Sequence, residues 1–236
     1  MSRKKDKEKI MVAEHIFELR HIATGTFLDR RGLVADYIKD SGLFNHWKID
    51  NNIVHFRDGQ NKIEQDGGFA GYKSLGYIVY NPHTYNYFVD KTIKFLSIIH
   101  KNDEYKIPKP TRFGTRLKVF IPSKMSFEKI NDKVYNTVFN NNFQQLIKGK
   151  GKDVRFTIEL IEEGFHIQIY GGPVHKNEVN NLMSFKSDQF KNAGLYFDID
   201  CYKTEKLNHE IIPDLLKKGV KLIWDKIENV ATGMGL

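Results

Sequence analysis

The sequence is poor in cysteine: Cys201 is the one cysteine among 236 residues, so no disulfide can form within the chain. This usage is typical of a reducing compartment, and we expect a cytoplasmic protein. Long apolar runs are also missing, because no segment approaches the roughly 20 residues of a transmembrane helix. The charged N-terminus has no apolar segment of the kind found in signal peptides. The sequence therefore predicts no membrane partner.

Negative charge is in deficit as well. Acidic residues number 29 against 37 basic ones, which gives a net charge of +8 and a pI near 9.3. The excess is concentrated in residues 1–10, expected to be a basic disordered tail, and in residues 91–120. A basic protein attracts anionic partners, which favours a nucleic acid or a nucleotide. An AT-rich genome would raise the lysine content without any functional cause.

Hydrophobic periodicity and turn residues predict the same order of elements twice. The first half, residues 11–107, is expected to contain a strand, a helix, three strands and a helix, at 13–21, 27–39, 53–57, 62–65, 75–80 and from Asn81-Pro82 onward. The second half, residues 108–236, is expected to repeat this order at 112–121, 127–147, 153–161, 165–170, 195–202 and 208–229.

Each half therefore has the order β-α-β-β-β-α, which predicts an internally duplicated α+β fold. Antiparallel strands that carry helices on one face would join into one curved sheet. In architecture this resembles a TATA-binding-protein-like saddle, and a shared architecture implies no shared function. Two unrelated ferredoxin-like halves are the alternative.

Side chains alternate across a strand, so the strands of the second half divide into an apolar and a polar face. Cys201 falls on the apolar face and is expected to be a packed thiol. The polar face carries six candidate site residues, which are Arg112, Arg116, His166, Tyr196, Asp198 and Asp200. We expect this face to lie uncovered and residues 171–193 to act as a lid over it.

Two interpretations of these residues stay open. Asp198 and Asp200 would together hold one Mg²⁺ or Mn²⁺ ion, or they would form ion pairs with Arg112 and Arg116 on a neighbouring strand. His166 is a candidate general base, or an ordinary half-exposed strand histidine. In the first half, by contrast, His15 and His21 share a strand face with apolar residues and are expected at the edge of the core.

Two short motifs carry a resemblance to other proteins. Arg112, Gly114 and Arg116 form an R-[IF]-G-x-R strand, and Asp198 and Asp200 form a late D-I-D strand before a long terminal helix. In these motifs the chain resembles a sporadically distributed prokaryotic protein family of unknown function. That resemblance implies no established activity, cofactor or catalytic residue. The scattered distribution of the family implies a setting in phage defence or toxin–antitoxin pairs, with a protein partner encoded nearby.

Three functions follow as expectations. The first is a binding protein that needs no cofactor and holds nucleic acid or a nucleotide through Arg112, Arg116, His166 and Tyr196. The second is a metal-dependent phosphoesterase or nuclease, with Asp198 and Asp200 as metal ligands. The third is a scaffold that binds a protein through a sheet edge or the last helix.

Overall fold

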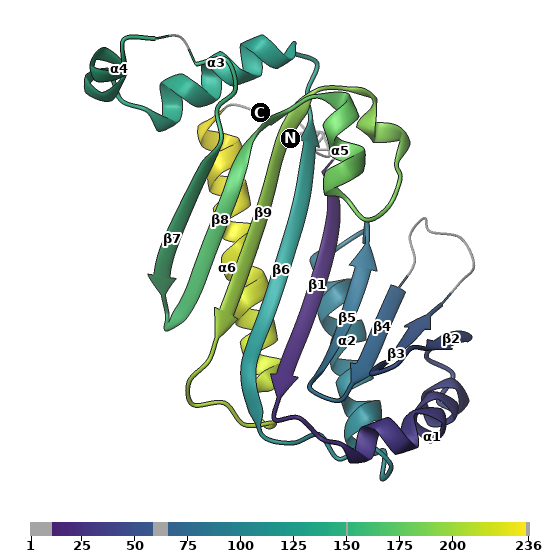
Figure 1. The fold of residues 1–236 in the computed structure, drawn as a ribbon. Helices are drawn as coiled ribbons and strands as arrows, with labels where there is room; N and C mark the ends of the chain where they lie inside the picture. The colour runs from purple at the N-terminus through teal and green to yellow at the C-terminus, as the bar shows by residue number, and fades with distance from the viewer. Residues whose placement is uncertain (1–10, 59–65, 150, 235–236) are drawn as a thin grey trace, which may run out of the picture.

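The structure is a computed structural model that describes residues 11–58, 66–149 and 151–234. Its nine described strands form a single antiparallel sheet in the order β2-β3-β4-β5-β1-β6-β9-β8-β7 (Figure 1). The expected α+β class with an antiparallel sheet is therefore confirmed. The predicted basic tail, residues 1–10, lies outside the described residues.

The two halves meet where β1 pairs with β6. The elements before this junction are β1 (Val12–His21), α1 (Thr26–Asp40), β2 (His46–Ile49), β3 (Ile53–Arg57), β4 (Asp66–Gly71), β5 (Ser74–Tyr80) and α2 (Tyr85–His100). Those after it are β6 (Pro110–Pro122), α3 (Phe127–Val138), α4 (Asn141–Ile147), β7 (Phe156–Glu162), β8 (Phe165–Val174), α5 (Lys176–Leu182), the 3₁₀ turn η1 (Asp188–Lys191), β9 (Gly194–Lys203) and α6 (Ile212–Gly233).

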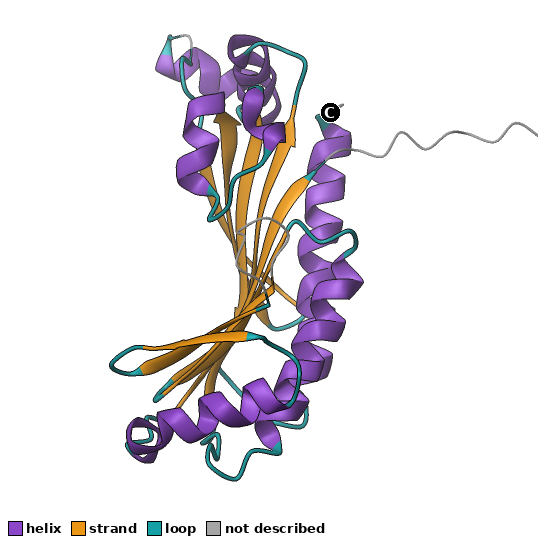
Figure 2. Ribbon diagram, turned by 90° about the vertical axis from the view of Figure 1, so that its right-hand side faces the viewer, coloured by secondary structure: helices purple, strands orange, loops and turns teal. Residues whose placement is uncertain are grey.

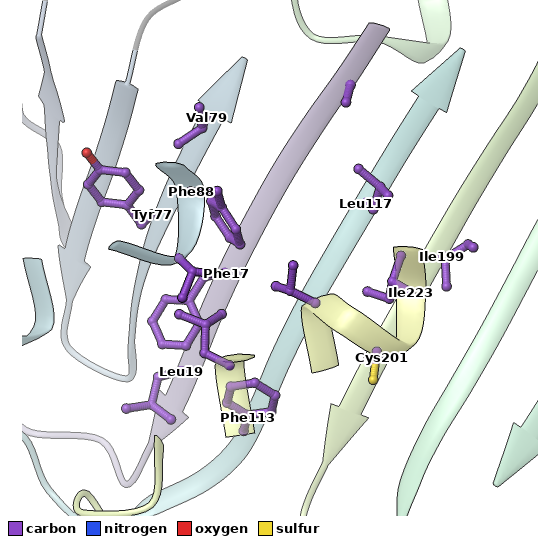
Figure 3. Close-up of a cluster of buried hydrophobic side chains, with 14 of the residues drawn as sticks. Phe17, Leu19, Tyr77, Val79, Phe88, Phe113, Leu117, Ile199, Cys201 and Ile223 are labelled. Atoms are coloured by element: carbon purple, nitrogen blue, oxygen red, sulfur yellow. The ribbon is translucent and has the colours of Figure 1, made fainter. Parts of the chain in front are cut away.

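One face of the sheet, called the helix face here, packs against the helices α1, α2, α3 and α6. Figure 1 shows α6 running behind the central strands, and Figure 2 shows the long helices along one side of the sheet. The core between these layers includes Phe17, Phe113 and Cys201, each of which is fully buried (Figure 3). The burial of Cys201 confirms the expected packed thiol, and it raises the pKa of that thiol to about 12.

The opposite face, called the open face here, carries Glu18, Arg116, Asp200 and the other side chains in register with them. Its middle holds no helix (Figure 2). At one end it is covered by residues 175–191, which contain α5 and η1 (Figure 1). Phe185 and Phe190 of this segment pack on Phe120 of the sheet in a second apolar cluster. The expectation that helices occupy one face alone is therefore wrong at this end.

The predicted long helix at 127–147 is also wrong. Phe139 has an extended backbone, and the side chain of Asn140 accepts a hydrogen bond from the backbone N–H of Phe143. An asparagine that caps in this way starts a new helix, so the segment divides into α3 and α4.

Other boundaries shift for similar local reasons. The helix expected from Asn81-Pro82 begins at Tyr85, because the Thr84 side chain caps it and Asn81 has a positive φ of 48°. The strands β2 and β4 were not predicted, and the strand expected at 62–65 lies outside the described residues. The hairpin at Glu163-Gly164 is confirmed, since both residues have the positive φ that a tight two-residue turn requires.

His15 and His21 are buried, with 1% and 4% of their surface exposed, as expected of residues at the core. The His15 ring lies between Phe88 and Trp224, at ring-centroid distances of 4.8 and 5.7 Å. Within the described parts of the chain, no helix is both long enough and apolar enough to span a lipid bilayer.

We expect Phe113→Ala to lower the free energy of unfolding by about 3–5 kcal/mol, the range for truncating a buried aromatic ring. Phe113 contacts Phe17 of the first half and Phe165 of the second, so both halves should unfold in one transition at lower denaturant. Circular dichroism during urea unfolding measures this. Leu146→Ala, at a side chain 79% exposed, should change stability by less than about 0.5 kcal/mol. Two separated transitions in Phe113→Ala would contradict a shared core.

Burial lowers the pKa of His15 from 6.5 to about 3, so the folded state keeps this ring neutral while the unfolded chain protonates it. Stability should therefore fall as the pH drops from about 6.5 toward 3. Relative to His15→Leu, the wild type should lose about 3 kcal/mol between pH 7 and 4. Urea unfolding of both proteins at each pH tests this, and parallel pH curves would contradict it.

Candidate functional site

Five of the six candidate residues lie on the adjacent strands β6, β9 and β8, in the uncovered part of the open face. Arg116 of β6 is directly opposite Asp200 of β9, which is opposite Gln168 of β8. Gly114, Tyr202 and His166 form the next row across the same strands. The alternation that predicted this face is therefore observed for both β6 and β9.

The arginines and aspartates form ion pairs across the strands. Arg116 binds Asp198 through two hydrogen bonds, one of them from Nε to Oδ1 at 2.6 Å. Arg112 donates from Nη2 to Asp200 Oδ2 at 2.8 Å, and its Nη1 lies 3.6 Å from Glu18. Of the two interpretations of the aspartates, this geometry favours the ion pairs.

Arg112 also begins a stack of flat groups. Its guanidinium carbon lies 4.6 Å from the centroid of the Tyr202 ring, and that ring stacks on His166 at 5.1 Å and 13°. Gly114 makes room for this arrangement, because a Cβ there would lie 2.6 Å from Arg112 Nη1. The glycine of the R-F-G-T-R segment thus lets Arg112 extend along the sheet toward Asp200.

The paired charges are only partly in water. The side chains of Arg112 and Asp198 are 18% and 16% exposed, whereas that of Arg116 is 45% exposed. Burial raises the pKa of the Asp200 carboxyl above its ordinary value, and the positive charges of Arg112 and Arg116 oppose that effect. Hydrogen bonding to Asp198 raises the pKa of Arg116, which therefore stays charged.

Tyr196 differs from the other predicted site residues. It is 2% exposed and belongs to the apolar cluster beneath residues 175–191. Burial raises the pKa of its hydroxyl, so the phenol stays neutral. The structure therefore separates Tyr196 from the uncovered part of the face, where the other five residues lie.

Residues 175–191 are held over this end of the face by Glu14, which the sequence analysis missed. The Glu14 carboxylate accepts hydrogen bonds of 2.8 Å from both the backbone N–H and the hydroxyl of Ser184, and it lies 3.4 Å from Lys118. The segment expected to be a lid is thus a packed cover at one end of the open face. The alternation of side chains along β1 places Glu14 on the face of the sheet that does not carry Phe17 and Leu19. This pattern could have predicted from the sequence that Glu14 lies on the open face.

Shallow hollows follow one another across the open face. One of about 270 Å³ is lined by Arg20, Phe69, Arg112 and Arg116. A second, of about 220 Å³, lies beside His166 and Tyr202 at the other side of the stack. A third shares Phe69 with the first and continues to Arg57 of β3. The face therefore offers a series of shallow hollows in place of one deep pocket.

The metal interpretation lacks further support in the described residues. Across 11–58, 66–149 and 151–234, no three His, Cys, Asp or Glu side chains are grouped so that they could hold a metal ion. Asp198 and Asp200 have oxygens bound to Arg116 and Arg112. The His166 ring stacks on the Tyr202 ring.

Comparison with known proteins adds no assignment, because no model of a known protein family matches the chain and no curated protein matches it significantly. The resemblance carried by the R-F-G-T-R and D-I-D segments thus stays a prediction.

A double-mutant cycle separates the ion-pair from the metal interpretation. Arg116→Ala and Asp198→Ala should show a coupling energy of about 1 kcal/mol in unfolding experiments, because the pair is bidentate but the Arg116 side chain is 45% exposed. Millimolar Mg²⁺ or Mn²⁺ should leave the melting temperature of the wild type unchanged. Stabilisation by either ion that disappears in Asp198→Asn would favour a metal site instead.

Proposed function

We propose that the open face binds nucleic acid as a single strand, with nucleotide bases stacking at His166 and Tyr202. The observation that carries this proposal is the row of flat groups formed by Arg112, Tyr202 and His166. Bases of single strands stack on aromatic side chains and on arginine, whatever their sequence. A helix-free sheet surface is a platform that leaves the bases room to spread.

The groups beside the stack suit the edge of a base. Glu159 and Gln168 line the hollow next to His166, and the Gln168 amide donates to Glu159 Oε1 at 3.0 Å. A carboxylate accepts hydrogen bonds from exocyclic amino groups, and an amide both donates and accepts. This pair would favour a base that carries an amino group.

Phosphate contacts come from arginines that are already held in place. A guanidinium has five N–H donors, and Arg116 uses two of its nitrogens on Asp198. A phosphate oxygen can therefore bind the remaining donors without breaking the ion pair. Arg20, whose side chain is 54% exposed, lies beside Glu18 in the same hollow and offers a second cation.

The mirrored strand order supports internal duplication, which we propose as the origin of the two halves. Without the extra edge strand β2, the order β3-β4-β5-β1 in one half corresponds to β7-β8-β9-β6 in the other, both read toward the junction of the halves. Duplication would explain why the long helices of both halves lie on the same face of the sheet, as in a TATA-binding-protein-like saddle. The defence or toxin–antitoxin setting remains a proposal that follows from the family resemblance.

Tyr202→Ala should weaken binding of a fluorescein-labelled single-stranded 12-mer about 10-fold, because one stacked base contributes about 1–3 kcal/mol. Fluorescence anisotropy measures the dissociation constant. Tyr202→Phe should bind like the wild type, since it keeps the ring. Tyr85→Ala, which removes a 43% exposed aromatic residue of the helix α2, is the control and should have no effect.

The proposal fails if the wild type does not bind the 12-mer at low salt. It also fails if Tyr202→Ala and Tyr85→Ala weaken binding equally.

A further inference from the structure

A cluster of basic side chains lies at the β2–β3 edge of the open face, away from the central strands that carry the residues predicted from the sequence. His46 and Lys48 of β2 pair with Arg57 and His55 of β3, so all four side chains point to the open face. They line a hollow of about 320 Å³.

The charge of this cluster is not balanced as it is at the centre of the sheet. Among the described residues that line the hollow, Asp50 alone is acidic, and Lys48 and Arg57 already outnumber it. Asp50 lies 2.8 Å from Lys48 and 3.3 Å from His55. The hydrogen bond from Lys48 lowers the pKa of the Asp50 carboxyl, and His55 has a weaker effect of the same sign.

We infer that His46, Lys48, His55 and Arg57 form a phosphate-binding subsite for the same single strand. Arg57 supplies a planar fork, Lys48 a point charge, and the imidazoles supply N–H donors, which together match a phosphodiester. The hollow shares His55 and Arg57 with the next one along the face, so a strand can pass from this subsite toward the stack.

The distance between the basic cluster on β2 and β3 and the stack at His166 defines the class of ligand. This inference rests on the proposed function. From β3 to β8 the sheet order includes six strand-to-strand steps. At about 4.8 Å each, the path along the sheet is about 29 Å. A mononucleotide is too short for this path, whereas strands of about four or more nucleotides are typical sites of single-strand-binding folds. The ligand is therefore an oligonucleotide that engages both ends.

The test compares a labelled single-stranded 8-mer with a labelled dinucleotide of the same composition. The wild type should bind the 8-mer at least 10-fold more tightly. Lys48→Ala/Arg57→Ala should remove this advantage, leave dinucleotide binding unchanged, and reduce the log–log salt slope for the 8-mer by about 0.7 per lost phosphate contact. The control variant Lys217→Ala/Lys221→Ala removes the same charge from the exposed side of α6, away from the open face. It should change the dissociation constant of neither ligand.

The outcomes separate the two proposals. If Tyr202→Ala weakens both ligands while Lys48→Ala/Arg57→Ala binds the 8-mer like the wild type, the base-stacking function stands and the phosphate subsite is overturned. If the wild type binds neither ligand, the proposed function itself fails and the subsite with it. If an octaglutamate peptide competes as well as an unlabelled 8-mer, the cluster recognises charge alone and the oligonucleotide class is overturned.

Discussion

The antiparallel pairing of β1 with β6 is the interaction on which the rest of the structure depends. It joins the two halves into one sheet, and it runs in register from Val12 opposite Phe120 to Arg20 opposite Arg112. On the helix face this pairing brings Phe17 against Phe113, and on the open face it brings Glu18 within reach of Arg112. The core and the candidate site therefore both depend on the β1–β6 pairing, and both would be disrupted if this pairing were lost.

The pairing of opposite charges explains why a face of partly buried charged side chains is stable. The four carboxylates on the central strands lie beside four cations: Glu14, Glu18, Asp198 and Asp200 against Lys118, Arg20, Arg112 and Arg116. An unpaired charge at such depth would be costly, because desolvation is not compensated. Arginine suits this role better than lysine, since its planar group can hold a carboxylate and stack on an aromatic ring at once.

The face of each long strand could be predicted from sequence, because side chains alternate with a period of two over β6 and β9. The partners could not, because Arg116 lies opposite Asp200 yet binds Asp198, a choice that depends on sheet twist and side-chain length. β2 was missed because it has only four residues, three of them exposed, so the alternation of His46 and Lys48 with Trp47 and Ile49 is too short to stand out. Its basic cluster with β3 arises from pairing, and no single segment displays it.

The centre and the β2–β3 edge of the open face differ in charge, and under the proposed function they would play different parts in binding one strand. Arginines already held by carboxylates lose little side-chain freedom when a ligand arrives, although those carboxylates also repel phosphate. At the β2–β3 edge the single carboxylate of Asp50 stands against both Lys48 and Arg57, so positive charge is in excess there and would attract phosphate. Under the proposed function, the charge of this edge would add to the phosphate contacts at the centre, while the stack at Tyr202 and His166 would contact bases. A ligand that satisfies both ends must be a strand, since neither free phosphate nor a single base spans the sheet.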